Sequence, residues 1–234
     1  MGQVGGNAMS VSTNEPAVAV REENTGRHNY YSPEDFIRRD VQAGVISLAD
    51  NNRAAQVAES FITGLHAGVD NEVGDTSGYL MYRAGYEWGL RNMASFNKRM
   101  RQEFGGGKND IWTMNKVFVW ETWWWPLTTQ GFGGWALDLK LQKKGVVVAE
   151  IFNSAVAQSM ERAGKPVCHM YAGLFAGAFS FYDRRERSAI EIQCYAMGNS
   201  SCKFLIGDSK DVDAAEFWRS EGATASEVTA RLRD

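Results

Sequence analysis

Two stretches in the last third of the chain decide the fold: PVCHMYAGLFAGAFSFY (residues 166–182) and AIEIQCYAMGNSSCKFLI (residues 189–206). The first is almost uncharged and rich in Gly and Ala, which predicts a helix from about residue 167 that lies close against its neighbours. The second predicts two strands, about 188–195 and 202–206, joined by a glycine turn. A helix followed by a hairpin is therefore the centre of the predicted fold.

The sequence before this centre predicts three more strands and a short helix. Residues 111–121 are β-branched or aromatic, residues 135–141 alternate strictly between apolar and other side chains, and residues 146–152 form an apolar run. Ser154 is a candidate N-cap for a helix that ends near Arg162.

The first half of the chain predicts helices. A Ser-Pro-Glu-Asp start at Ser32 predicts a helix to about residue 42, and apolar residues at spacings of three and four predict others over about 53–67 and 77–104. Residues 1–31 are polar and Gly-rich, which is typical of a flexible tail. Residues 208–234 predict a surface helix.

The order of helices, strands, helices and strands predicts an α+β fold with a mostly antiparallel sheet. We expect a single domain over residues 32–207, with a helical first half to residue 104 and a sheet half over 111–207. The C-terminal helix over 208–234 would follow it.

Composition excludes several classes of protein. The chain has 234 residues and a formal net charge of −3, which does not indicate a nucleic-acid-binding or polybasic membrane-anchored protein. An odd count of three cysteines argues against a disulfide scaffold. With no signal peptide and no apolar run long enough to span a membrane, a cytoplasmic location is expected.

The three cysteines and one glutamate form a candidate zinc site. Cys194 and Cys202 flank the predicted hairpin turn, Glu191 lies three residues before Cys194, and Cys168 lies near the start of the Gly-rich helix. Three thiolates and a carboxylate suit a closed, structural zinc site. Buried reduced cysteines and a Cys194–Cys202 disulfide are the alternatives. Positions 191 and 194 face opposite sides of a regular strand, so one ion reaches both only if the strand bulges or ends there.

The two quoted stretches resemble the signature of the V4R (4-vinyl reductase) domain family. The shared pattern is a cysteine, a helix with paired glycines, E-x-x-C, a glycine turn, and a cysteine before an aromatic residue. The close match covers about residues 153–207. The resemblance implies a fold related to the TRAPP transport subunit and to nitric-oxide sensor domains. It also implies zinc binding at the four positions occupied here by Cys168, Glu191, Cys194 and Cys202. His169, beside the first of these, is either a further ligand or an ordinary helix histidine.

A tryptophan-rich segment is the second candidate site, since six of the eight tryptophans lie between residues 112 and 135. Such a cluster suits either an aromatic wall for a planar apolar ligand or a core and oligomer interface. The residues expected to contact a ligand are Trp120, Trp123, Trp135, Phe175 and Phe179.

We expect a non-catalytic, zinc-stabilised module that senses or carries a small aromatic or tetrapyrrole-like molecule, with no catalytic residues assigned. It would act through a homodimer or a partner protein, without binding nucleic acid or spanning a membrane. The alternatives are an accessory or reductase protein of chlorophyll-type pigment synthesis, which the family name suggests, and a structural or assembly subunit.

Overall fold

A four-stranded antiparallel sheet is the centre of the computed structural model, which describes residues 36–49, 52–104, 110–160 and 162–233. The strand order is β4-β5-β7-β6. The strands are β4 (Gly134–Asp138), β5 (Val147–Phe152), β6 (Ser188–Gln193) and β7 (Cys202–Gly207). Side chains of β5 alternate between buried and half-buried, as expected for a strand whose two faces differ. The predicted α+β class with an antiparallel sheet is therefore confirmed.

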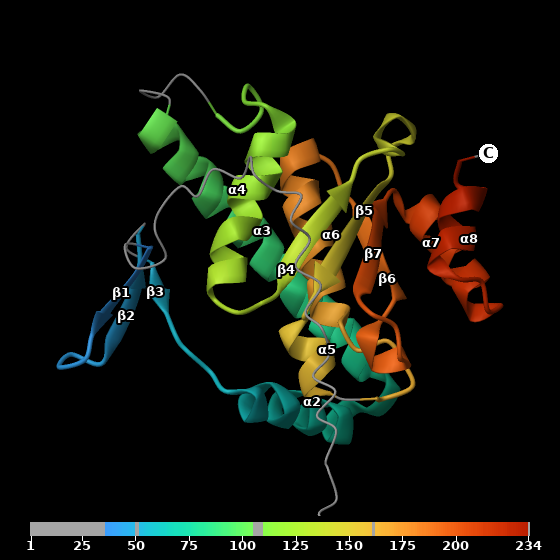
Figure 1. The fold of residues 1–234 in the computed structure, drawn as a ribbon, viewed down its shortest axis with the longest axis horizontal. Coiled ribbons are helices and arrows are strands. Elements are labelled where there is room, and N and C mark those ends of the chain that lie inside the picture. The colour runs from blue at the N-terminus through green and yellow to red at the C-terminus, as the bar shows by residue number, and fades with distance from the viewer. Residues whose placement is uncertain (1–35, 50–51, 105–109, 161, 234) are drawn as a thin grey trace, which may run out of the picture.

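Helices cover both faces of this sheet (Figure 1). One face packs on α6 (His169–Asp183), with α3 (Ser77–Phe104) and α4 (Lys116–Thr129) around it, and together they form the main hydrophobic core. The other face packs on α7 (Ser209–Ser220) and α8 (Ala225–Arg231) around a smaller apolar cluster. The predicted C-terminal surface helix is thus two helices.

Helices α3 and α6 approach each other closely because glycines line their contact. A Cβ atom added at Gly85 would lie 2.0 Å from the carbonyl oxygen of Met170, and one added at Gly173 would lie 2.0 Å from that of Tyr82. Gly89 and Gly177 repeat this relation one turn further along each helix. Only glycine leaves room for the two backbones to touch, which explains why small residues recur at a spacing of four on both helices.

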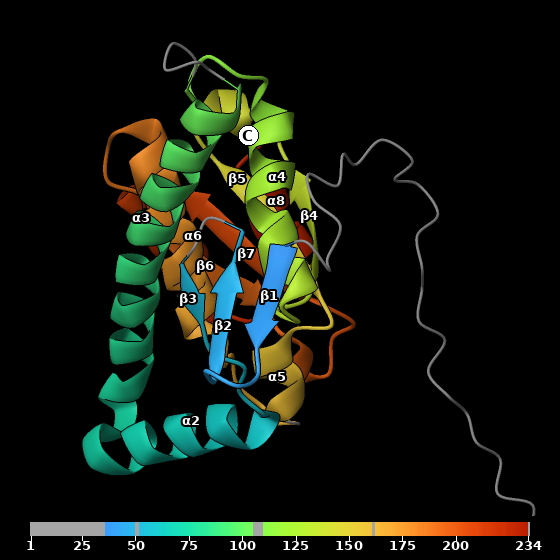
Figure 2. The ribbon, with the colours of Figure 1, turned by 90° about the vertical axis from the view of Figure 1, so that its left-hand side faces the viewer.

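A small antiparallel ribbon lies apart from the main sheet, beside α3 and α4 (Figure 2). It consists of β1 (Ile37–Asp40), β2 (Val45–Leu48) and β3 (Arg53–Ala54), and it leads into α2 (Glu59–Val73).

The ribbon corrects two predicted helices. Residues 37–40 are strand where a helix to residue 42 was predicted, and residues 32–35 lie outside the described residues. The helix predicted over 53–67 instead spans Glu59–Val73, because Arg53 and Ala54 pair with β2. Local capping signals do not report the pairing of residues 37–40 with 45–48, because that pairing is a contact between separate segments of the chain.

The strand predicted over 111–121 is also wrong, since this segment runs into α4. The side chain of Asn115 accepts a hydrogen bond from the Phe118 amide and caps the helix. Aromatic and β-branched residues favour strands only in a pleated environment, and here the large rings are buried on nearly every side of a helix.

The remaining elements agree with the sequence predictions to within a few residues. The helix over 77–104, the Gly-rich helix and the strands near 146–152, 188–195 and 202–206 are confirmed. The strand predicted over 135–141 is the shorter β4, and the helix after Ser154 is the short α5 (Ala155–Ser159). The predicted tail over 1–31 lies outside the described residues. Within the described part of the chain, no helix has the length and apolar character that a membrane span requires.

Candidate metal centre and neighbouring pockets

One helix start and one hairpin bring the four predicted zinc ligands together. Cys168 is the N-cap residue of α6, Glu191 lies on β6, Cys194 directly follows that strand, and Cys202 begins β7. One donor atom from each lies within 4.8 Å of the others, and all four residues are buried.

A β-bulge resolves the geometric objection raised by a regular strand. Glu191 pairs with Phe204 and Gln193 pairs with Lys203, so Ile192 is an extra residue on β6. The strand then ends at Gln193. The bulge and the strand end together bring Glu191 and Cys194 to the same side.

The separation of the Cys168 and Cys202 sulfurs suits a four-coordinate ion better than a disulfide between these two residues. The sulfurs of Cys168 and Cys202 are 3.7 Å apart. A tetrahedral zinc site with Zn–S bonds of about 2.3 Å separates its sulfurs by about 3.8 Å, whereas a disulfide needs about 2.0 Å. All three cysteines are free thiols in the structure.

The side chain of Glu191 has a carboxylate oxygen that is available to bind an ion. Its Oε2 atom accepts a hydrogen bond of 2.9 Å from the Cys168 amide, while Oε1 is buried without a hydrogen-bond partner among the described residues. A buried carboxylate oxygen without a partner costs free energy, which metal coordination removes. The amide of Tyr195 also donates to the Cys202 sulfur at 3.3 Å, a hydrogen bond that would stabilise this sulfur as a metal-bound thiolate.

The pKa values of the clustered residues give a second reason why a cation would stabilise the cluster. Hydrogen bonds from the Cys168 and Cys202 thiols hold the pKa of Cys194 well below its usual range. Burial, together with the charge of the Cys194 thiolate, raises the pKa of Glu191 to about 8. The pKa of Cys194 is thus lowered while those of its three neighbours are raised, and a divalent cation would let all four groups ionise together.

The cluster lies in a segment of the chain that matches a known domain. Residues 147–208 match the V4R domain. All four clustered residues lie inside this V4R segment (residues 147–208).

The chain is similar to a curated protein sequence and to solved structures. The uncharacterized protein MJ0150 of Methanocaldococcus jannaschii is 27% identical over 70 residues, 30% of this chain and 40% of that protein. The match thus spans less than half the length of this curated relative. Among solved structures, the phenol-responsive sensory domain of the transcription activator PoxR, solved with phenol, has a TM-score of 0.61 at 19% identity. The alignment covers 79% of this chain and 90% of that domain, and it shows a shared fold.

A second solved structure is a vinyl-4-reductase family protein from Methanocaldococcus jannaschii. It is 16% identical to this chain, with a TM-score of 0.44. The alignment covers 65% of this chain and 82% of the chain of that protein.

His169, next to the first cysteine of the V4R segment, points elsewhere. A Cβ atom at Gly78 would lie 3.1 Å from its Nε2 atom, so the imidazole lies against the start of α3. His169 is not among the four clustered donors.

The predicted aromatic wall is part of the packed core. The rings of Trp120 and Phe179 stack at 3.9 Å, and Phe175 lies 6.3 Å from both Trp123 and Trp135. All five side chains are at most 3% exposed. Only Trp123 also lines a described pocket, so ligand contact by the other four stays a prediction.

An open apolar pocket lies between the ribbon, α2 and the V4R segment. Its volume is about 550 Å³. Aliphatic and aromatic side chains dominate the lining, which includes Ile46, Phe61, Leu65, Trp88, Phe132 and Met170. Sequence reasoning missed this pocket because it predicted helices where the ribbon lies.

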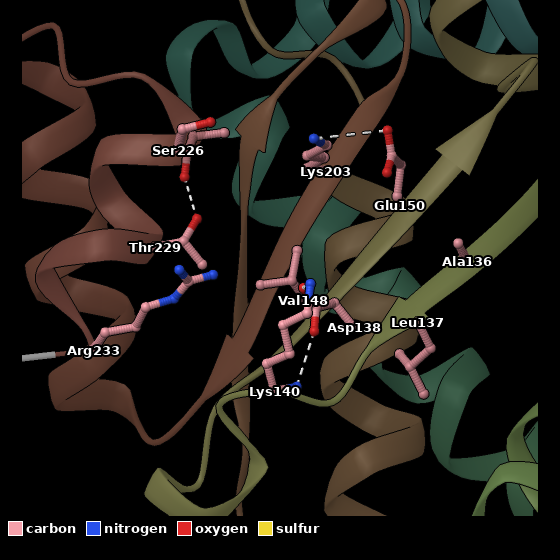
Figure 3. Close-up of a pocket in the computed structure, with 11 residues that line it drawn as sticks. Ala136, Leu137, Asp138, Lys140, Val148, Glu150, Lys203, Ser226, Thr229 and Arg233 are labelled. Atoms are coloured by element: carbon pink, nitrogen blue, oxygen red, sulfur yellow. Dashed lines mark hydrogen bonds and ion pairs between the residues drawn. The ribbon is translucent and has the colours of Figure 1, made fainter.

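A second, polar pocket of about 620 Å³ lies between the sheet and α8 (Figure 3). Its charges are largely paired within the wall. The Nζ atom of Lys203 is 3.8 Å from Oε1 of Glu150, and that of Lys140 is 3.4 Å from Oδ2 of Asp138. These two pairs account for four of the five charged side chains in the lining, Arg233 being the fifth, and we assign no ligand to this pocket.

Proposed function

We propose that the chain is a zinc-stabilised module that binds a small apolar or aromatic molecule, as a sensor or carrier. The observation that carries this proposal is the apolar pocket of about 550 Å³, in a fold shared with a sensory domain that was solved with phenol. A concave, mostly apolar pocket with a few polar groups is the usual form of a small-molecule site.

The metal would be zinc, held by Cys168, Glu191, Cys194 and Cys202. Three sulfurs and one oxygen are donors that zinc accepts, and four protein ligands leave no position for a catalytic water. Zinc would therefore stabilise the structure, by joining the start of α6 to the β6–β7 hairpin.

Metal and ligand would be coupled through α6. Cys168 begins this helix, and Met170, two residues later, lines the apolar pocket. A ligand that moved the first turn of α6 would therefore act on the metal-bound hairpin, and through it on the C-terminal helices. Such a path would let the module report occupancy to a homodimer mate or partner protein.

Binding of a neutral aromatic probe to a blocked pocket tests the proposal. Ala155 lines the apolar pocket, whereas Ala84 is exposed on α3 and lines none of the described pockets. Isothermal titration calorimetry with para-biphenylmethanol should show binding to the wild type and to Ala84→Phe. Ala155→Phe should weaken binding by about tenfold or more. The new ring would occupy space in the pocket, and the probe would lose roughly the contact area of one of its own rings. Equal affinities in all three proteins would contradict the site.

A further inference from the structure

We propose that the ligand is an organic anion, and that Arg99 of α3 binds its carboxylate or a similar acidic group. This inference rests on the proposed function and names the chemical class of its ligand. It starts from a smaller pocket, about 330 Å³ in volume, which adjoins the apolar pocket.

The two pockets form one site of mixed character, because Leu48, Trp88 and Gln130 line both. The apolar pocket is lined mainly by aliphatic and aromatic side chains. The smaller one, which we call the arginine pocket, is lined by Arg53, Arg91 and Arg99, and none of its described lining residues is acidic. A ligand that filled both would need an apolar body and an anionic end.

Within the arginine pocket, Arg99 carries a side-chain group that the described residues leave without a hydrogen bond. Its side chain is buried, with only 8% of the residue exposed, and its Nε atom has no hydrogen-bond partner in the part of the chain that the structure describes. Among the described residues no carboxylate lies within ion-pair distance of it. A buried charge is normally paired, because burial without a partner is costly.

Aromatic rings hold the guanidinium in place. Its central carbon lies 5.3 Å from the ring centre of Phe96 and 5.9 Å from that of Phe36. Rings attract a cation and restrict its rotamers, but they leave its N–H groups without an acceptor. The planar fork of an arginine matches a carboxylate with two parallel hydrogen bonds, so an acidic ligand would complete the site.

Other polar groups of the arginine pocket are already engaged or exposed. The Oδ1 atom of Asn92 accepts a hydrogen bond of 2.8 Å from the indole of Trp123. Arg53 and Arg91 are exposed at the rim, where they would attract an anion towards Arg99.

A matched pair of probes tests this inference: para-biphenylcarboxylate and para-biphenylmethanol, which differ in the charge of one end. By calorimetry the full chain should bind the carboxylate about tenfold or more tightly than the alcohol. Arg99→Met should abolish this preference while changing affinity for the alcohol by about twofold at most. Arg99→Lys should keep part of the preference, since it keeps the charge without the fork.

The control is Arg83→Met, which removes an exposed arginine of the same helix that pairs with Glu87. It should keep the full preference for the carboxylate. Arg99→Met should also melt no lower than the wild type without ligand, because it removes an unpaired buried charge.

The outcomes separate the two proposals. Alcohol binding without a preference for the carboxylate, or a preference that survives Arg99→Met, would overturn the anionic ligand and leave the apolar site in place. Binding of neither probe to the wild type would overturn both.

Discussion

At the residue scale, the cluster of Cys168, Glu191, Cys194 and Cys202 depends on charge. Four acidic groups share one buried volume, where hydrogen bonds with the neighbouring thiols raise the pKa of Cys168 and burial raises the pKa of Glu191, so that both hold their protons more firmly. A divalent cation replaces those protons, so we expect the cluster to lose its metal on acidification, when thiols and carboxyl group regain them.

His66 gives a pH dependence outside the cluster. Burial lowers the pKa of His66, although Asp70, one turn further along α2, opposes the shift. The folded state therefore binds fewer protons than the unfolded chain, whose histidine titrates near 6.5. This contribution to stability is present above that pH and is lost as the pH falls through it.

We expect the melting temperature of the wild type to fall below about pH 6.5, and that of His66→Gln to fall less. Thermal unfolding followed by circular dichroism between about pH 5 and 8 measures this. Parallel curves for the two proteins would show that His66 is not responsible.

At the element scale, sequence patterns found the elements whose local and tertiary preferences agree. The Gly-rich helix, the hairpin after it and the long helix over 77–104 were predictable, since periodicity and burial coincide there. The ribbon and α4 were not. In the ribbon, strand pairing overrides local helix caps, and in α4 burial of Trp120, Trp123 and Trp124 overrides strand propensity. The bulge at Ile192 was foreseen only as a condition for zinc binding.

The α3–α6 contact gives a prediction about packing. Gly85→Ala or Gly173→Ala should destabilise the protein by at least about 1–3 kcal/mol, because the new methyl group meets backbone atoms at 2.0 Å. Gly68→Ala on α2 is the matched control. Nothing lies within 4 Å of a Cβ atom there, so it should stabilise the helix by about 0.5–1 kcal/mol. Urea unfolding measures all three variants.

Equal effects of the substitutions at Gly85 and Gly68 would contradict close packing of α3 on α6. In that case helix propensity alone would explain both changes.

At the scale of the whole molecule, the V4R segment holds the cluster of Cys168, Glu191, Cys194 and Cys202, and the first half of the chain supplies most of the lining of the apolar pocket and the arginine pocket. Sequence reasoning reached the first because its four residues lie within 35 residues of one another and resemble the V4R signature, which decided between zinc and the alternatives that spacing left open. It missed the second because Arg99, Trp88 and the ribbon meet only after the chain has folded. The aromatic cluster lies in the packed core, Trp123 also lines the arginine pocket, and ligand contact by the other four residues stays a prediction. Homodimer formation and a cytoplasmic location stay predictions.

Metal content tests the central claim most directly. Elemental analysis of folded, reduced protein should find about one zinc per chain in the wild type, because three thiolates and a carboxylate converge on one buried point. Met197→Ala, at an exposed position of the same hairpin, should bind as much zinc as the wild type. Cys194→Ser should lose most of the zinc and unfold more easily. Less than about half an equivalent in the wild type, or equal zinc in Cys194→Ser, would contradict the metal centre.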